Sequence, residues 1–385
     1  MSLDSTSQKH PKAETVHASS RRLAYLDWLR GAAAVIMLQG HVFHSFTDKP
    51  GRQSSVYVLS QFIGGLPPAL FLFLTGVTLA FLMDSAQRKE IAPMRRFWIS
   101  LRRAGYLFAL AFAFRFQLWL FGQPSSPWTD LLKVDILNAM GLAIAMLSVM
   151  SVFTTRDRVR LCAALGAAIA VVSPWVSSLD WSLVPRPLAV YFVPDYNFFG
   201  FFPWAAFLAF GVSTGSLLRT ISKDSIERLM QWSAIGGLTL IALARYFADL
   251  PYSIYTKSDF WLDSPALVFI KTGIILVMLS FAYVWTRYAV GSHKWSWVAQ
   301  FGTTSLLVYW VHIELVYGRW FWAWKENLSV NQAMLAAFAI IPLMLGLSVV
   351  RTHWSRIAVW FGPPPTPLEP APIPVRADDS GPRRR

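Results

Sequence analysis

Long apolar runs alternate with short polar segments along most of this chain. Each run holds roughly 16 to 27 residues, which as a helix is close to the length that crosses the ~30 Å hydrocarbon core of a bilayer. The pattern predicts an all-α protein, a polytopic membrane bundle of about ten transmembrane helices. The predicted spans are Leu23 to Phe46, Tyr57 to Met83, Ala104 to Phe121, Ile136 to Phe153, Leu161 to Val176, Phe198 to Leu217, Gln231 to Phe247, Pro265 to Trp285, Val298 to Tyr317 and Asn331 to Val349.

Lysine and arginine are unevenly divided between the loops that these spans would create. Both tails and the loops after the second, fourth, sixth and eighth spans hold 24 of them, whereas the five intervening loops hold seven. Basic residues accumulate in the cytoplasmic loops of membrane proteins. We therefore expect both termini in the cytoplasm and the chain in the cell inner (plasma) membrane.

The composition agrees with this interpretation, since 55% of the 385 residues are hydrophobic and 15% are charged. The net charge of +14 is explained by topology, so we expect no nucleic-acid partner. A single cysteine, Cys162, excludes an intramolecular disulfide and a multi-cysteine metal site.

We divide the chain into three parts. Residues 1–22 form a polar cytoplasmic tail that lacks the apolar core of a cleavable signal peptide. Residues 23–349 form the transmembrane domain. Residues 350–385 are rich in proline and arginine, and we expect a disordered cytoplasmic tail there.

The first span carries four ionisable residues close to one helical face: Asp27, Arg30, His41 and His44. At about 100° per residue, the eleven steps from Arg30 to His41 return within about 20° of the start. Ionisable groups inside a bilayer are costly, so this stripe should face a bundle interior or a water-filled cavity. The structural alternative is a helix-end ion pair between Asp27 and Arg30, with the histidines as hydrogen-bonded packing residues.

The ninth span offers another histidine at a depth similar to that of His41. Ser305, Tyr309 and His312 share a face through spacings of four and three residues. A neutral imidazole can take a proton from a hydroxyl or amine and return it, as acyl transfer requires of a general base. We therefore expect His41, His312 and His44 to be catalytic, and Tyr309 and Asp27 to bind substrate.

The loop after the second span is rich in arginine. Its topological role alone can explain this charge, but such a cluster could equally hold the phosphates of coenzyme A through bidentate, charge-assisted contacts. The candidate ligands for this cofactor are Arg30, Arg96, Arg102 and Arg103.

Three further cations fall in the outer halves of spans: Arg115, Arg245 and Lys271. They either reach the outer headgroups or line an acceptor cavity for a hydroxyl-rich or anionic sugar. Of these, Arg115 and Lys271 are our candidate substrate ligands. The sequence has no GxSxG elbow, Walker loop, HExxH or dinucleotide fingerprint, so we expect chemistry built from intramembrane residues without a metal.

Five segments together resemble, in order, the bacterial relatives of heparan-alpha-glucosaminide N-acetyltransferase, which are related to the acyltransferase-3 family. They are RRLAYLDWLRGAAAVIMLQGH, PPALFLFLTGVTLAF, DILNAMGLAIAML, FFGFFPWAAFLAFGVSTG and TSLLVYWVHIELVYG. The resemblance implies a helical bundle that admits acetyl-CoA from the cytoplasm and presents its acyl group to a sugar on the other side.

The resemblance also bears on the first span. In acyltransferase-3 proteins an arginine is followed after ten residues by an essential histidine, and Arg30 and His41 match that spacing. The glycosaminoglycan enzyme instead has asparagine at the position of His41 and uses a histidine in the following loop. That loop has no histidine after His44 here, which leaves His41 or His44 as the replacement.

The sequence thus predicts a membrane acyltransferase that moves an acetyl or other acyl group from coenzyme A to a sugar hydroxyl or amine. Transfer is either direct or through an acetyl-histidine. The expected partners are membrane lipids, a coenzyme A thioester and a carbohydrate or glycolipid acceptor, with a homodimer left open. The alternatives are a transporter or flippase for a small anion or lipid-linked sugar, and a non-catalytic scaffold or receptor.

Overall fold

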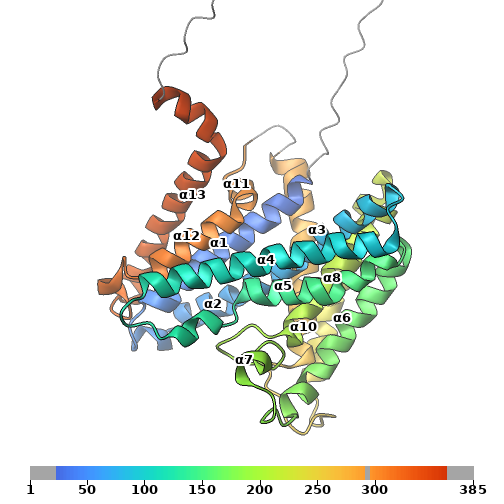
Figure 1. Ribbon diagram of the computed structural model, residues 1–385, viewed down its shortest axis with the longest axis horizontal. Coiled ribbons are helices and arrows are strands. Elements are labelled where there is room, and N and C mark those ends of the chain that lie inside the picture. The colour runs from blue at the N-terminus through green and yellow to red at the C-terminus, as the bar shows by residue number, and fades with distance from the viewer. Residues whose placement is uncertain (1–22, 291–294, 362–385) are drawn as a thin grey trace, which may run out of the picture.

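The computed structural model describes residues 23–290 and 295–361 (Figure 1). Over this part of the chain it is all-helical, with one isolated bridge between Thr47 and Leu328, so the predicted α class is confirmed. The α-helices are α1 (Ala24–Phe46), α2 (Ser55–Gly64), α3 (Pro67–Arg88), α4 (Pro93–Phe121), α5 (Ile136–Leu147), α6 (Thr155–Ser178), α7 (Arg186–Ala189), α8 (Phe201–Thr220), α9 (Ile226–Ala248), α10 (Pro265–Val284), α11 (Trp297–Thr303), α12 (Ser305–Tyr317) and α13 (Val330–Phe361). Short 3-10 or π-helical pieces are η1 (Gly51–Gln53), η2 (Trp128–Leu132), η3 (Ser148–Val152), η4 (Lys223–Ser225), η5 (Trp285–Val290) and η6 (Trp322–Trp324).

Seven helical segments within the described residues are long and apolar enough to cross a membrane, by length and composition. They are Ser55–Arg88, Pro93–Phe121, Trp128–Val152, Thr155–Ser178, Phe201–Thr220, Pro265–Ala289 and Val330–Trp354. The chain is therefore a multi-pass membrane protein. The count of ten spans and the cytoplasmic location of both termini stay predictions.

Two predicted spans are interrupted. The span expected at Tyr57–Met83 divides into α2 and α3, because Pro67 and Pro68 begin a new helix. The span expected at Val298–Tyr317 divides at Thr304 into α11 and α12. An unbroken apolar run therefore gives two helices in each of these places.

The chain ends differ in part from the predicted boundaries. The last span was expected to stop at Val349, but α13 continues as a helix to Phe361. The predicted tail at residues 1–22, and the remainder of the C-terminal tail at 362–385, lie outside the described residues.

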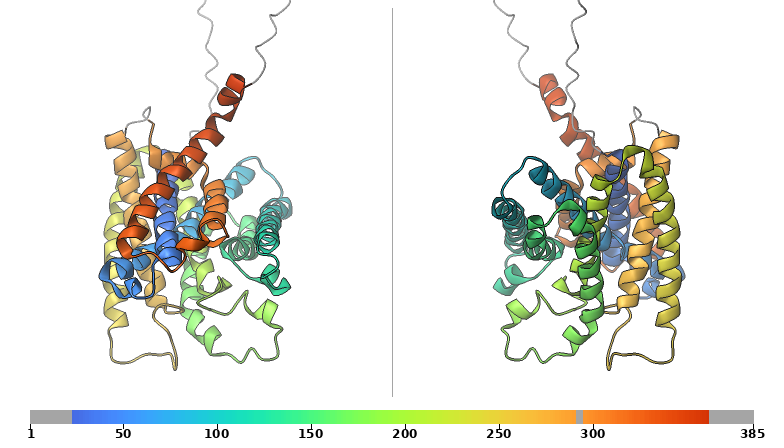
Figure 2. Two further views of the ribbon diagram at one scale, coloured as in Figure 1. Left: turned by 90° about the vertical axis from the view of Figure 1, so that its left-hand side faces the viewer. Right: turned by 90° about the vertical axis from the view of Figure 1, so that its right-hand side faces the viewer.

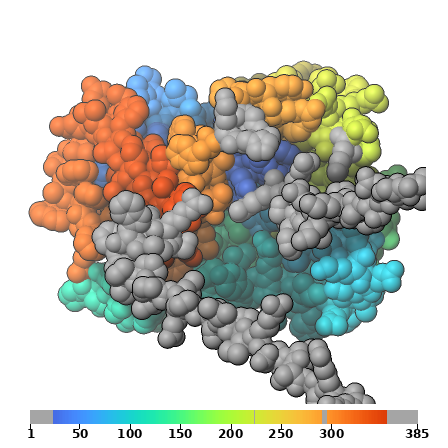
Figure 3. All heavy atoms as spheres, turned by 90° about the horizontal axis from the view of Figure 1, so that it is seen from above, coloured from blue at the N-terminus to red at the C-terminus, as the bar shows by residue number. Residues whose placement is uncertain are grey.

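Helix α1 lies at the centre of the bundle, in contact with α2, α3, α10, α11, α12 and α13. Figure 3 shows it in dark blue between the outer helices, seen from above. Gly31 and Gly302 make the crossing of α1 and α11 close: a β-carbon at Gly302 would lie 1.8 Å from the carbonyl oxygen of Asp27, and one at Gly31 would lie 1.7 Å from that of Val298. Since α12 follows α11 directly, this crossing places α12 beside α1.

Two groups of helices flank this centre. Helices α3, α6 and α8 pack on one another, and α9 packs on α10. Helices α4 and α5 also lie side by side, and Figure 2 shows α4 nearly end-on, whereas α9 and α10 stand upright on the opposite side of the bundle. Side chains of both α1 and α4 line two of the cavities described next.

Candidate active site between the first and twelfth helices

Four adjoining cavities run along α1. The arginine cavity, about 630 Å³, is lined by Arg30, Arg88 and Arg219. It shares Arg30 and Thr78 with the middle cavity, about 400 Å³. The middle cavity shares Tyr309 and other side chains with the histidine cavity, about 870 Å³.

The fourth cavity continues from the histidine cavity toward α10. This lysine cavity, about 480 Å³, is lined by Lys271, Trp204 and Trp261. It shares His41 and His44 with the histidine cavity. A series of neighbouring spaces thus links the arginine-lined end of the bundle to the lysine-lined end.

The polar stripe of α1 faces these cavities along its whole length. Asp27 and Arg30 line the arginine cavity, and His41 and His44 line the histidine and lysine cavities. The expected ion pair is also present, since Arg30 Nη1 donates to Asp27 Oδ1 over 3.0 Å. Asp27 and Arg30 therefore form the helix-end ion pair and line the arginine cavity at the same time.

His41 and His312 meet directly. Nδ1 of His41 lies 2.9 Å from Nε2 of His312, and the two rings are nearly parallel, with their centroids 5.2 Å apart. The His312 side chain is fully buried, and its Nδ1 lies 2.8 Å from the carbonyl oxygen of Val308, one helical turn earlier. Two residues separated by 271 positions are joined in this way.

These contacts fix the tautomers of the neutral pair. The Val308 carbonyl can only accept, so His312 Nδ1 carries a hydrogen and its Nε2 carries a lone pair. His41 Nδ1 must then donate to that lone pair, which leaves Nε2 of His41 unprotonated. The local geometry therefore prepares one specific atom, His41 Nε2, to accept a proton.

Tyrosines surround the two histidines. Tyr317 packs edge-on against His41 at a centroid distance of 5.4 Å, and its hydroxyl lies 3.1 Å from Nδ1 of the exposed His44. Tyr309 lies 5.9 Å from His312 between ring centroids and lines both the middle and the histidine cavities. His44 and Tyr309 thus lie at the cavity that holds His41, though neither contacts its imidazole nitrogens.

The predicted arginines differ in where they lie. Arg103 lines the middle cavity and donates to Thr78 over 3.3 Å. Arg96 is buried and donates to the Val152 carbonyl, and Arg102 is exposed. Neither Arg96 nor Arg102 lines any of the four cavities. The structure therefore brings Arg30 and Arg103 to the cavities, but not Arg96 or Arg102.

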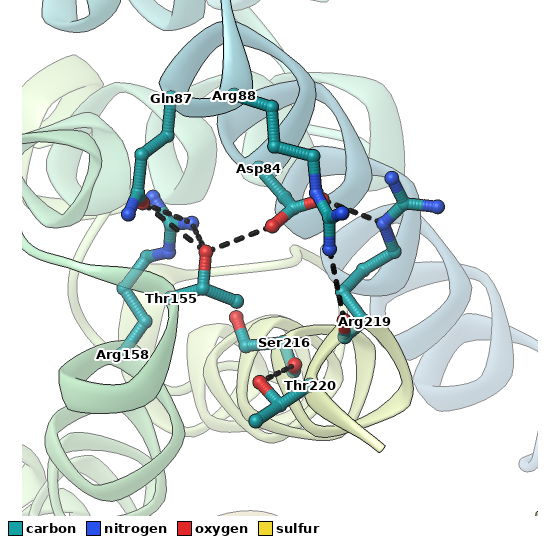
Figure 4. A network of polar contacts seen from close by, with 8 residues as sticks. All are labelled: Asp84, Gln87, Arg88, Thr155, Arg158, Ser216, Arg219 and Thr220. Carbon is teal, nitrogen blue, oxygen red and sulfur yellow. Dashed lines mark hydrogen bonds and ion pairs between the residues drawn. The ribbon is translucent and has the colours of Figure 1, made fainter. Parts of the chain in front are cut away.

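The candidate ligands chosen from the sequence omitted two arginines that line the arginine cavity, although one of them, Arg88, belongs to the arginine-rich loop. Arg88 and Arg219 both bind Oδ2 of the buried Asp84, over 2.8 and 2.6 Å (Figure 4). The other oxygen of Asp84 accepts from Thr155, which also accepts from the buried Arg158. A buried carboxylate near the end of an apolar helix was the signal that could have found this network.

The remaining predicted ligands lie around the histidine and lysine cavities. Arg115 lines the histidine cavity and forms a 3.2 Å ion pair with Asp135. Lys271 lines the lysine cavity, with its Nζ 5.2 Å from the centroid of the Trp204 ring. Arg245 is exposed and paired with Asp249, away from all four cavities. The three intramembrane cations, which looked alike in the sequence, thus have three different environments.

Comparison with known proteins adds a family. The sequence profile described as heparan-alpha-glucosaminide N-acetyltransferase, catalytic, matches residues 22–251, more than half of the chain. No curated protein matches the chain. Within the described residues there is also no group of three or more His, Cys, Asp or Glu side chains that could hold a metal ion.

Proposed function

The chain belongs to the heparan-alpha-glucosaminide N-acetyltransferase catalytic family, and we propose that it transfers an acetyl group from acetyl-CoA to a sugar hydroxyl or amine. The single observation that carries this proposal is the hydrogen-bonded pair of His41 and His312 in a series of adjoining cavities. Such a pair supplies a base, and the cavities supply room for two substrates.

We place the donor at the arginine end. Arg30, Arg88, Arg103 and Arg219 line the arginine and middle cavities, and guanidinium groups bind phosphate oxygens in a bidentate manner. With both termini in the cytoplasm, as the loop charges predict, this end opens to the cytoplasm of a cell whose inner membrane holds the protein. Coenzyme A would then reach inward from its phosphates toward Tyr309 and the histidines.

We place the acceptor on the other side of the two histidines. In the reaction, Nε2 of His41 takes the proton of the acceptor hydroxyl or amine as its oxygen or nitrogen attacks the thioester carbonyl carbon. The new C–O or C–N bond forms and the C–S bond breaks. His41 then returns the proton to the thiolate, so that acetyl-CoA and acceptor give acetylated acceptor and CoASH.

His312 acts in this scheme as a positioning residue. Its Nε2 accepts from His41 Nδ1–H, so it holds the base in the reactive tautomer. When His41 gains a proton it becomes an imidazolium, and the same hydrogen bond becomes charge-assisted and stronger. The pair therefore stabilises the charged state that develops during the reaction.

The test is acetyl transfer by purified protein in detergent. Labelled acetyl-CoA is incubated with the protein and a mixture of saccharides, and both acetylated product and free CoASH are measured. Wild type should consume acetyl-CoA, and His41→Ala should lose activity by about 10²–10⁴-fold, the usual contribution of a general base.

His353→Ala is the matched control for this test. His353 sits on α13 and also approaches the carbonyl four residues earlier, over 3.1 Å, but lines none of the four cavities. It should keep wild-type activity. Wild type that binds a sugar or anion but never consumes acetyl-CoA would refute the enzyme and favour a transporter or flippase that uses the same cavities.

A further inference from the structure

Tyr309 lies at the junction where the middle cavity meets the histidine cavity. Within the described residues, three side chains line both cavities, those of Phe71, Ile136 and Tyr309. The first two are apolar, so of these three only Tyr309 can donate a hydrogen bond from its side chain. In the proposed reaction the acetyl group comes from the middle cavity to the base in the histidine cavity, so it has to pass this junction.

The hydroxyl of Tyr309 is open to the cavities. The residue is half-buried, and its hydroxyl forms no hydrogen bond with any described residue. Its oxygen is also not one of the buried side-chain oxygens that lack a partner, so the protein does not enclose it. A phenol in this state can donate its hydrogen to a ligand that enters the cavities.

Neighbouring donors are already engaged within the protein. The Tyr317 hydroxyl lies 3.1 Å from Nδ1 of His44, and the guanidinium of Arg115 is held in an ion pair. In the middle cavity, the hydroxyls of Thr75 and Thr78 both donate to atoms of the bundle. The phenol at the junction differs from all of these groups because the fold leaves its hydrogen unused.

Aromatic packing fixes the place of this hydroxyl. The Tyr309 ring contacts Phe114 and His312, with ring centroids 5.4 and 5.9 Å away and planes inclined at 46° and 66°. Tyr309 precedes His312 by three residues on α12, so the two side chains share a helical face. One helix thus carries both the phenol and the histidine that positions the base, at a fixed spacing.

The proposed reaction creates a negative charge that the two histidines do not bind. When the acceptor attacks the thioester carbonyl carbon, the π electrons of the carbonyl bond move to its oxygen and give a tetrahedral oxyanion. Nε2 of His41 takes the acceptor proton, and Nδ1–H of His312 donates to the Val308 carbonyl. Hydrogen-bond donors that are in place before the reaction stabilise such an oxyanion strongly, so the site needs a further donor.

We propose that Tyr309 is a catalytic residue, whose hydroxyl donates a hydrogen bond to the thioester carbonyl oxygen and stabilises the oxyanion. This inference rests on the proposed function, because it assigns a step of the same reaction. A phenol is neutral near pH 7, and Tyr309 keeps its proton throughout. When the oxyanion collapses, the C=O bond forms again, the C–S bond breaks, and the thiolate takes the proton that His41 holds.

Tyr309→Phe tests the hydroxyl alone. The ring and its packing remain, and the hydroxyl that is lost has no partner in the described protein, so the fold should be unchanged. Loss of one oxyanion donor lowers kcat by about 10²–10³-fold, and we expect a fall of this size in the assay with labelled acetyl-CoA and mixed saccharides. KM for acetyl-CoA should stay the same, because the lost interaction strengthens only in the transition state.

Two further proteins control for effects other than loss of the donor. Tyr246 is exposed on α9 and lines none of the four cavities, so Tyr246→Phe should keep the wild-type kcat. A variant with 3-fluorotyrosine at position 309 keeps both the ring and the hydroxyl, so it should keep most of the rate. A single elution peak in size-exclusion chromatography shows that each protein is folded.

The outcomes separate the two proposals. A wild-type kcat in Tyr309→Phe, a rise in KM for acetyl-CoA without a fall in kcat, or a 3-fluorotyrosine variant as slow as Tyr309→Phe would each overturn the oxyanion role and leave the acyltransferase standing. No consumption of acetyl-CoA by wild type would overturn the acyltransferase, and the role of Tyr309 with it.

Discussion

Replacement of His312 by leucine tests whether the second histidine acts only through the first. Leucine has a similar volume, so the buried site stays filled, but Nδ1–H of His41 loses its acceptor 2.9 Å away. A hydrogen bond to a group that becomes charged contributes about 1.5–3 kcal/mol. At about 1.4 kcal/mol per tenfold change in rate, kcat should fall by about 10- to 150-fold while KM for acetyl-CoA stays the same.

The double variant gives the sharper result. Loss of His41 alone should lower the rate by about 10²–10⁴-fold. If His312 only positions His41, the variant that lacks both should be no slower than His41→Ala, because residues that act as one unit are not additive. His312→Gln, whose amide oxygen can accept the same bond, should recover part of the lost rate.

The assay can follow the CoASH thiol directly. The chain has one cysteine, and Cys162 is fully buried, so a thiol reagent sees little background from the folded protein. Losses that multiply in the double variant, or an unchanged rate in His312→Leu, would show that His312 acts independently of His41 or not at all. Either result would refute the tautomer argument.

Three further predictions follow from the packing and the arginines. Gly302→Val should prevent stable folding, because its β-carbon would lie 1.8 Å from a backbone oxygen of α1; the variant should lose its monodisperse peak in size-exclusion chromatography. Gly346→Val should fold, because nothing lies within 4 Å of a β-carbon there. Equal behaviour of the two variants would contradict the close crossing of α1 and α11. Arg103→Gln should raise KM for acetyl-CoA about tenfold or more, the worth of one charge-assisted bond, but not KM for acetyl-pantetheine, which lacks the nucleotide phosphates. Arg102→Gln should change neither of these KM values. An equal rise in KM for both variants would show that overall positive charge, and not the lining of the middle cavity, binds acetyl-CoA. Asp84→Asn should lower the free energy of unfolding by about 1.5–3 kcal/mol, because Arg88 and Arg219 lose the charge of the buried carboxylate that they share but remain partly exposed to solvent. An unchanged melting temperature would show that this network does not stabilise the fold.

The sequence was most informative where helical periodicity alone determines the face and depth at which a side chain lies. The spacing of Asp27, Arg30, His41 and His44 placed them close to one face of α1, and a polar face within a membrane must turn inward whatever surrounds it. The depth of His312 on its span followed from the same counting, and its ring does meet that of His41. Their catalytic roles stay predictions until activity is measured.

Other features depended on neighbours that the sequence does not reveal. Arg96, Arg102 and Arg103 lie within eight positions on one helix, yet only Arg103 lines a cavity, because the rotation of α4 is set by its packing on α5. Arg219 lies on α8, far along the chain from α4, and its ion pair with Asp84 holds it at the arginine cavity. The break at Thr304 comes two residues after Gly302, where α11 crosses α1 closely, and the sequence alone does not reveal this crossing.

The break between α2 and α3 lies at the cavities, and Gly64, Pro67 and Pro68 line the histidine cavity. An ordinary helix start leaves several backbone N–H groups without a partner, which lipid cannot satisfy. Here two of the first three residues of α3 are prolines and have no N–H group to satisfy. On the other side, the N–H groups of Gly65 and Leu66 bond to the carbonyls of Gln61 and Ile63. The chain can therefore bend between α2 and α3 while few backbone N–H groups lose their hydrogen-bond partners.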